Sequence, residues 1–257
     1  MAISFKEIKE LTKSRKAREE QGLFVTEGTK GFEETPPELI RAVFTTGEWA
    51  RANAALLKKA PPSAEITADV RKDRFAGLCG TKTPQGVLCV AEMPKFDMQS
   101  AFAAENPLIA VLEDVQDPGN VGTIIRTCEA AGADAVFLTR GSADPYSPKT
   151  VRATMGSVFR TPHFLIDDME SFMALLDENG IAKAAALPRA EAPYFGQDLT
   201  RPLALFIGNE GNGLRAETAA AADVALTIPM AGKVESLNAA MAASVLLFEA
   251  ARQRSVK

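Results

Sequence analysis

Short apolar runs alternate with longer amphipathic segments along the whole chain. The clearest run, LIAVL at 108–112, contains no polar residue, which is typical of a strand that is buried on both faces of a sheet. Amphipathic segments of helical length separate most of these runs. Such an alternation predicts an α/β protein with mostly parallel sheets.

The first part of the chain has the pattern of a small α/β domain. We expect helices at 5–18, 48–59 and 70–78. We expect strands at 23–26, 42–45, 65–67 and 86–92. The segment 93–107 then mixes polar, small and proline residues, so we place a domain boundary there and assign residues 1–95 to the first domain.

The second part, residues 106–257, has the pattern of a parallel-sheet domain. Strands are expected at 108–112, 135–138, 161–165, 181–185, 203–207 and 225–228. Helices are expected at 121–131, 149–156, 169–179, 214–221 and 237–254. The last helix has an apolar or small face that should pack on the sheet, formed by Leu237, Met241, Ser244, Val245 and Phe248.

Composition and charge narrow the class of protein. The chain has 257 residues, is 46% hydrophobic and carries a formal net charge of −4. Net acidity argues against a protein that simply coats nucleic acid, but it leaves room for a local basic patch. Because charges begin at position 6 and no window approaches roughly 18 unbroken apolar residues, we expect neither a secretory signal nor a membrane span.

The cysteines give no sign of a covalent framework. Cys79, Cys89 and Cys128 are odd in number and lack CxxC spacing. We therefore expect no disulfide framework and no metal site, and a reducing cytoplasm fits this composition.

The first of three notable loops is EDVQDPGNVGTIIRTCEAAGAD, which follows the strand at 108–112. Loops that follow the strands of α/β sheets are where such proteins bind ligands. Asn120 comes just before an apolar helix, so its simplest interpretation is a helix N-cap. Arg126 lies within that helix, where a solvent-exposed arginine is usual.

The second and third loops combine glycine with polar residues in the same way. In LALFIGNEGNGL, glycines surround Glu210, which lets backbone amides face a ligand, although a purely structural turn is equally compatible. The spacing matches neither GxGxxG nor a Walker motif, so an ordinary nucleotide-binding enzyme is disfavoured. In IPMAGKVESLNAAMAA, Ser236 is expected to cap the last helix, with Leu237 and Asn238 in its first turn.

In order, spacing and strand context, the three loops together resemble the motifs of the SpoU family of knotted RNA 2′-O-methyltransferases. The residues that carry the resemblance are Asn120, Gly122, Arg126, Gly208, Glu210, Gly211, Gly213, Ile228, Pro229, Met230, Gly232, Ser236, Leu237 and Asn238. The segments KSRKAREEQGLFVTEG and TPQGVLCVAEMP resemble the start and the end of the substrate-binding domain that many members carry. One departure follows Asn238, where many members have Val-Ser-Val and this chain has Ala239, Ala240 and Met241, which we expect on the helix packing surface.

The resemblance implies a fold, a cofactor and an assembly. The fold is a C-terminal domain whose parallel sheet carries a deep trefoil knot, with residues 236–252 passing through a loop, preceded by a small α/β domain like those of ribosomal proteins. The cofactor is S-adenosyl-L-methionine, which would be held by Gly208, Ile228, Met230 and Leu237, with the strand end at Leu138 and Thr139 as a further contact. Members act as homodimers with active sites near the subunit interface, and no metal or membrane partner is implied.

The resemblance also implies the reaction, transfer of a methyl group to a ribose 2′-hydroxyl of structured RNA. Ribosomal RNA is the expected substrate, transfer RNA is the alternative, and a non-catalytic RNA-binding or assembly protein that retains the fold is a third hypothesis. The residues that would surround the reacting groups are Asn120, Arg126, Glu210, Ser236 and Asn238. A guanidinium has a pKa above about 12, so we expect Arg126 to hold a phosphate or to stabilise the developing alkoxide.

A basic stretch in the first helix is the candidate RNA contact. Lys6, Lys9, Lys13 and Lys16 share one side of the expected helix, and Arg15 and Arg18 extend the patch. Taken alone, such a run is more often a solvated face, but the family resemblance favours a phosphate-binding role for Lys9, Lys13, Arg15, Lys16 and Arg18. The only histidine, His163, lies beside a strand with no triad or metal pattern, so a structural role is expected. Trp49, Tyr146 and Tyr194 are too scattered to indicate a stacking platform.

Overall fold

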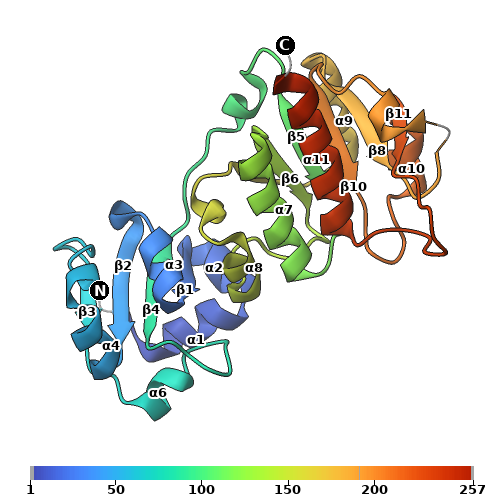
Figure 1. Cartoon of the computed structure of the whole chain (residues 1–257). Helices are drawn as coiled ribbons and strands as arrows, with labels where there is room; N and C mark the ends of the chain where they lie inside the picture. Colours follow the sequence, from blue (N-terminus) through green and yellow to red (C-terminus); the bar gives the residue numbers. More distant parts are fainter. Residues whose placement is uncertain (1–2, 191, 256–257) are drawn as a thin grey trace. The chain divides into compact units, whose positions relative to one another are not determined.

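The computed structural model describes residues 3–190 and 192–255, which divide into two compact units (Figure 1). The first unit runs to Lys95 and also includes the later segment Asp144–Phe159. The second unit comprises Phe96–Ala143 and the chain from Arg160 onward. The chain therefore returns to the first unit in the middle of the second, which the simple boundary at 93–107 does not describe.

The sheet of the first unit is mixed rather than mostly parallel. Its order is β1 (Leu23–Glu27), β4 (Val87–Glu92), β2 (Ile40–Thr45) and β3 (Glu65–Thr67). The inner strand β4 runs antiparallel to β1 and to β2, and among the described pairings only β2 and β3 are parallel. The expectation of parallel pairing was wrong here, because apolar runs locate strands but do not fix the direction in which a later strand returns.

Helices cover both faces of this sheet. Ile8, Leu11 and Phe75, from α1 (Phe5–Lys13) and α6 (Lys72–Ala76), pack on one face. The other face is covered by α3 (Gly28–Glu34), α4 (Gly47–Ala52) and α8 (Pro148–Thr154), which contribute Phe32, Trp49 and Val151. The remaining short elements of this unit are α2 (Arg15–Gln21), η1 (Pro37–Leu39), α5 (Ala54–Leu57) and η3 (Ser157–Phe159).

The helix expected at 5–18 is two helices, because Ser14 interrupts it. Ser14 adopts an extended backbone conformation at the end of α1, and its side chain accepts a hydrogen bond from the Ala17 amide as the N-cap of α2. A serine that offers such a local cap competes with continuation of the helix. The helix expected at 48–59 is likewise divided at Asn53.

The second unit is built on a parallel sheet, as expected. Its order is β7 (His163–Ile166), β6 (Ala135–Thr139), β5 (Leu108–Leu112), β10 (Leu203–Ile207), β8 (Ala182–Ala186), β11 (Val224–Thr227) and the two-residue β9 (Ala192–Pro193). Every described pairing in this sheet is parallel. The carboxyl ends of these strands therefore lie along one edge of the sheet, where the three candidate loops begin.

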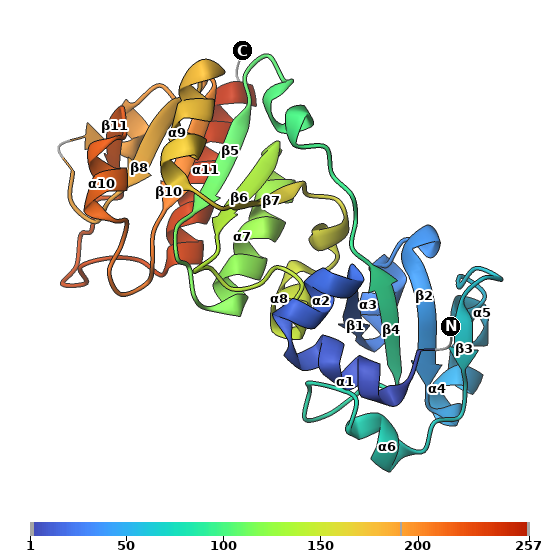
Figure 2. The ribbon, with the colours of Figure 1, turned by 180° about the vertical axis from the view of Figure 1, so that it is seen from behind.

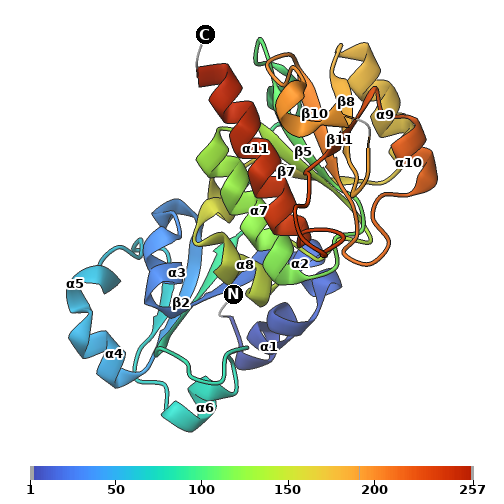
Figure 3. The same ribbon diagram turned by 45° about the vertical axis from the view of Figure 1, so that its right-hand side comes forward.

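Two helices lie side by side on one face of this sheet, and two shorter helices cover the other. Figures 1 and 3 show α7 (Pro118–Ala131) beside α11 (Ala239–Ser255), while α9 (Met169–Glu178) and α10 (Ala216–Ala220) lie on the face that Figure 2 shows. Ile124 and Leu246 belong to the core on the first side, and Phe172 and Leu176 to the core on the second. The short helices η2 (Met98–Phe102) and η4 (Tyr194–Gly196) complete the unit.

The last helix is oriented differently from the expectation. Its buried residues are Ala239, Ala240, Ala243, Leu246, Leu247 and Ala250, whereas Met241 and Phe248 are 61% and 51% exposed. Small side chains let α11 approach α7 closely, and Leu246 and Leu247 also enter the core, whereas Met241 and Phe248 point away from the sheet. Its cap is also different, because the Asn238 side chain rather than that of Ser236 accepts hydrogen bonds from the Ala240 and Met241 amides.

Among the described residues, no helix is long and apolar enough to cross a membrane.

Candidate functional site

Three side chains from the three candidate loops form one chain of hydrogen bonds. Asn238 Nδ2 donates to Asn120 Oδ1 at 3.0 Å, and Asn120 Nδ2 donates to Glu210 Oε1 at 2.8 Å. Glu210 and Asn238 lie 90 and 118 positions after Asn120 in the sequence, so only the fold brings the three together. Asn120 is not the N-cap of α7; Asp117 takes that role by accepting from the Gly119 and Asn120 amides.

Glu210 also fastens the second loop to the backbone of the first. Its carboxylate accepts hydrogen bonds from the backbone amides of Gln116 at 3.1 Å and Asp117 at 3.2 Å. Partial burial favours the neutral acid, but the hydrogen bonds from the Asn120 side chain and from these amides outweigh it, so the pKa of Glu210 lies below its ordinary value. Glu210 is therefore a carboxylate at neutral pH and acts as an acceptor.

Replacement of Glu210 by Gln should lower stability in a pH-dependent way. Gln keeps one acceptor oxygen and loses the charge, so we expect a loss of about 1 kcal/mol at pH 7, because the site is partly exposed. A depressed pKa stabilises the folded state above the unfolded value of about 4.5, and this contribution is lost as the pH falls through the folded value. Urea unfolding of both proteins at pH 7 and below pH 4.5 checks this. A difference that stays constant or grows in acid contradicts it.

The second loop is a tight turn that leaves no room for side chains at its base. Asn209 and Gly213 exchange backbone hydrogen bonds, and Asn209 Oδ1 accepts from the Gly211 and Asn212 amides. A Cβ on Gly208 would overlap the backbone of Gly213 and Leu214. Glycine is therefore required at Gly208 by close backbone approach, and Gly213 also has a positive φ of 71°.

A cavity of about 540 Å³ lies between the second loop, the third loop and the segment after β8. Its wall combines apolar side chains, glycine backbone, the carboxylates Glu210 and Glu235, and the guanidinium Arg189. All four residues assigned to the cofactor line it, namely Gly208, Ile228, Met230 and Leu237. Leu138 and Thr139 do not line it, and Thr139 instead bonds Asp114.

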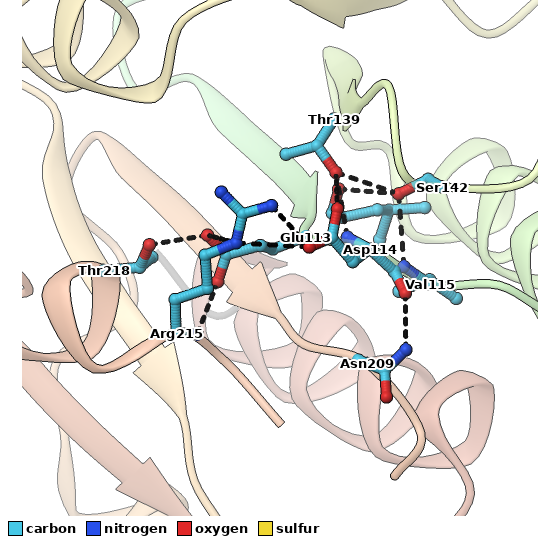
Figure 4. Close-up of polar contacts among 9 residues, drawn as sticks. Glu113, Asp114, Val115, Thr139, Ser142, Asn209, Arg215 and Thr218 are labelled. Carbon is cyan, nitrogen blue, oxygen red and sulfur yellow. Dashed lines mark hydrogen bonds and ion pairs between the residues drawn. The ribbon is translucent and has the colours of Figure 1, made fainter. Parts of the chain in front are cut away.

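A polar network at the end of β5 supports the loops from behind (Figure 4). The Glu113 carboxylate is 1% exposed and accepts from Thr218 Oγ1 at 2.6 Å and from the Arg215 amide at 2.8 Å. Asp114, at a positive φ of 55°, accepts from Thr139 Oγ1 and Arg215, and its carbonyl accepts from Asn209 Nδ2 at 2.8 Å.

Neither Glu113 nor Asp114 was identified as a site residue from the sequence. The available signal was a pair of acidic residues directly after a buried strand. In α/β proteins, ligand-binding sites lie at this end of the strands. The hydrogen bonds from Thr139 and Arg215 outweigh the effect of burial and keep the pKa of Asp114 below its ordinary value. The network therefore fixes the positions from which the first and second loops start.

Two of the candidate catalytic residues stand apart from this chain of hydrogen bonds. Ser236 is exposed and lines the cavity. Arg126 is exposed on α7 and is not among the residues that line the cavity. Within residues 3–190 and 192–255, neither side chain has a hydrogen bond or ion pair, so no direct polar contact within this chain positions Arg126.

The basic stretch of the first unit is smaller than expected. Arg18 is 3% exposed, and its guanidinium donates to Asp144 at 2.5 and 2.8 Å and to the Leu11 carbonyl. Arg18 is therefore a structural residue, and its assignment to RNA was wrong because it is buried and paired. The sequence pattern did not show this, since the partner Asp144 lies 126 positions away. Lys9, Lys13 and Lys16 are exposed, and Arg15 is half-buried beside Glu19.

The histidine and the thiols are structural. His163 is buried, with Nδ1 at 2.9 Å from the Thr161 carbonyl and Phe96 against its ring. Burial raises the pKa of all three cysteine thiols to about 12, so none is a nucleophile at neutral pH. In the described part of the chain, no group of three or more His, Cys, Asp or Glu side chains could hold a metal ion.

Comparison with known proteins gives consistent matches for both units. Residues 107–248 match the SpoU rRNA Methylase family, and residues 4–89 match the MRM3-like substrate binding domain. An uncharacterized tRNA/rRNA methyltransferase of Synechocystis sp. is 32% identical over 242 residues, which cover 93% of this chain and 87% of that protein. The 23S rRNA (guanosine(2553)-2′-O)-methyltransferase RlmP of Bacillus subtilis is 36% identical over 177 residues, 69% of each chain.

Solved structures agree with these matches. The SpoU methyltransferase AviRb from Streptomyces viridochromogenes, in complex with AdoMet, has a TM-score of 0.86 at 30% identity, with 99% of both chains covered. A rRNA methyltransferase from Sinorhizobium meliloti, also with AdoMet bound, has a TM-score of 0.81 at 32% identity, with 96% of this chain and 94% of that chain covered.

Proposed function

Since this chain belongs to the SpoU rRNA Methylase family, we propose that it transfers a methyl group from S-adenosylmethionine to a ribose 2′-hydroxyl of ribosomal RNA. The observation that carries the proposal is the cavity. Two of the motif loops line it, and hydrogen bonds to Asn120 join both of these loops to the remaining one. Relatives named as 23S rRNA 2′-O-methyltransferases support the substrate class. The substrate-binding domain match supports recognition of RNA by the first unit.

The cavity fits S-adenosylmethionine in size and in the chemistry of its wall. A volume of about 540 Å³ lies within the range of roughly 300–1,000 Å³ that is usual for small-molecule sites. Glu210 and Glu235 carry charge opposite to that of a sulfonium and an ammonium group, and apolar side chains suit the rest of the molecule. The residues proposed to hold it are Gly208, Ile228, Met230 and Leu237.

The protein's own task in the reaction is to orient the hydroxyl and to promote loss of its proton. When bound, S-adenosylmethionine supplies a methyl group on a positively charged sulfur. Arg126 holds the phosphate beside the target ribose or stabilises negative charge as it develops on the 2′-oxygen, since a guanidinium stays protonated. Asn120, Glu210 and Asn238 hold the three loops together by hydrogen bonds. Ser236 lines the cavity, and we propose that its hydroxyl donates a hydrogen bond to a bound group.

The lysines of the first helix are proposed to contact RNA phosphates. Lys9 and Lys13 are exposed on α1, and Lys16 is exposed on α2 with Arg15 beside it. Positive side chains of this kind raise RNA affinity without reading its sequence. We also propose that the protein acts in the cytoplasm. The proposed ribosomal RNA substrate and the three free thiols in the described residues support this.

We also propose a homodimer, supported by an exposed apolar face on α11. Met241 and Phe248 are two turns apart on that helix and more than half exposed. Contiguous apolar residues on an outer helix are typical of an interface. Because Arg126 does not line the cavity of its own chain, a second copy offers a way for it to reach reacting groups.

Replacement of Phe248 by Lys should convert the dimer to monomer. A charge placed in the apolar centre of a two-fold interface occurs twice in each dimer. We therefore expect the dissociation constant of the dimer to rise at least tenfold. Sedimentation velocity measures the change. Glu178 is exposed on α9, so Glu178→Lys is the matched control and should remain dimeric. A wild-type monomer at concentrations that support activity contradicts the proposal.

The trefoil knot is also a proposal. Its support is that the exposed segment before Asn238 lies against the first loop through Asn120, after which α11 packs beside α7. Stretching a single denatured chain from its two ends tests it. A knot leaves the chain shorter than the roughly 3.4 Å per residue that a free chain reaches, whereas full extension contradicts it.

Calorimetry and methyl transfer together separate the proposed enzyme from a non-catalytic RNA-binding protein. We expect the purified protein to bind S-adenosylmethionine and to transfer its labelled methyl group to ribosomal RNA. Binding of RNA without binding of S-adenosylmethionine supports the non-catalytic alternative. Transfer to purified transfer RNA but not to ribosomal RNA replaces the proposed substrate.

A further inference from the structure

A second hollow, of about 470 Å³, lies entirely within the first unit and has no part in the methyl-transfer site. It is formed by α4, α6 and the segment before β4. The apolar part of its wall includes Trp49 and Phe75, which are 6% and 2% exposed. The polar part is provided by Glu48, Lys72 and Gln85, all of which are exposed.

The wall of this hollow is built rather than incidental. Trp49 Nε1 donates to Thr29 Oγ1 at 2.9 Å, its ring packs against Phe32, and the Thr46 side chain caps α4 through the Trp49 amide. A Cβ on Gly86 would lie 2.7 Å from Thr46 Oγ1, so a glycine is needed for the strand to pass this closely. The position and orientation of the indole are therefore fixed.

The rim of the hollow combines an ion pair that a ligand can replace with one fixed amide side chain. Lys72 Nζ lies 2.6 Å from Glu48 Oε2, and both side chains are more than 70% exposed. An exposed ion pair of this kind contributes little to stability, so a ligand can replace it. Gln85 Oε1 accepts from the Thr29 amide at 2.9 Å, which holds the side chain in place at the rim.

From the apolar wall and the polar rim, we infer that this hollow of the first unit binds an unpaired base of the RNA substrate. The inference rests on the proposed function, because it takes the ligand to be RNA. A base has an apolar face and a polar edge, which matches an apolar wall with donors and acceptors at its rim. A phosphate matches less well, because Glu48 cancels the charge of Lys72. The volume suffices for one base, which a loop of folded RNA can expose by unstacking.

The sole tryptophan of the chain, Trp49, reports directly on this hollow. We expect short single-stranded RNA to change the Trp49 emission of the full-length protein in a saturable way, and a duplex of the same sequence to do so much less. Glu48→Gln should weaken this binding about tenfold and raise the KM for RNA by a similar factor, with kcat and the affinity for S-adenosylmethionine unchanged. Glu38→Gln, an exposed carboxylate outside the hollow, is the matched control.

Two results would overturn the inference. One is Trp49 emission that stays constant at RNA concentrations that saturate methyl transfer. The other is an RNA affinity of Glu48→Gln equal to that of wild type and of the Glu38→Gln control. Failure of the proposed function has a different signature, since it is absence of methyl transfer, whereas Trp49 emission decides the inference whether or not transfer occurs.

Discussion

Replacement of Arg126 by Ala should reduce methyl transfer by a factor of about 10² to 10⁴ while the affinity for S-adenosylmethionine stays within twofold of wild type. The factor is that expected from loss of a group that acts on proton removal or on developing charge in the transition state. The cofactor affinity should not change, because Arg126 does not line the cavity. Single-turnover transfer to RNA and calorimetric titration with S-adenosylmethionine measure the two effects.

A control for Arg126→Ala is available in the same unit. Arg201 is also exposed, and only its backbone carbonyl has an assigned partner among the described residues. Arg201→Ala should keep full activity, which separates a local effect from a general loss of positive charge. Full activity of Arg126→Ala itself would remove the residue from the mechanism, and loss of cofactor binding would assign it to the fold of the cavity.

Replacement of Gly208 by Ala should abolish binding of S-adenosylmethionine, with an affinity loss of at least 100-fold. The added Cβ meets backbone atoms of Gly213 and Leu214, which cannot move aside as a flexible side chain does, so the second loop must open. Opening this loop displaces Glu210, and with it the three hydrogen bonds that join it to the first loop. Calorimetric titration of the variant checks the expected loss.

Gly196 provides the matched control for Gly208→Ala. A Cβ there meets no atom within 4 Å, and Gly196 does not line the cavity. Gly196→Ala should therefore bind S-adenosylmethionine as wild type does. If Gly208→Ala also binds normally, the tight approach of the second loop is not needed for the cofactor site.

The strands of the second unit could be predicted closely from the sequence. The runs at 108–112 and 203–207 coincide with β5 and β10, because an uninterrupted apolar run with polar ends has few other stable positions in a fold. Helix α3 was missed, since GTKGFEE contains two glycines and only Phe32 from it enters the core. Such a short helix is held by packing rather than by its own propensity.

Side-chain orientation was harder to predict than the elements themselves. The periodicity of the last helix placed Met241 and Phe248 on the sheet, but the face that packs on α7 carries the alanines with Leu246 and Leu247. That choice depends on a neighbour more than a hundred residues away. Arg18 was misassigned for the same reason, because its partner Asp144 comes from the returning segment of the first unit. Local pattern does not carry such distant pairings.

The candidate site was predicted as a set of loops rather than as a geometry. Family resemblance selected Asn120, Glu210 and Asn238, and the structure joins these three by direct hydrogen bonds. It did not select Glu113 and Asp114, which only the three-dimensional arrangement relates to Asn209 and Arg215.

The central claim is methylation of a ribose 2′-hydroxyl in ribosomal RNA, and mapping of 2′-O-methyl positions in RNA from cells with and without the protein tests it most directly. We predict that a defined ribosomal RNA nucleotide loses its 2′-O-methyl group without the protein. Wild type should restore it, and Arg126→Ala should not. Unchanged methylation at every ribosomal position, together with failure of the purified protein to methylate ribosomal RNA from the deficient cells, would contradict the account.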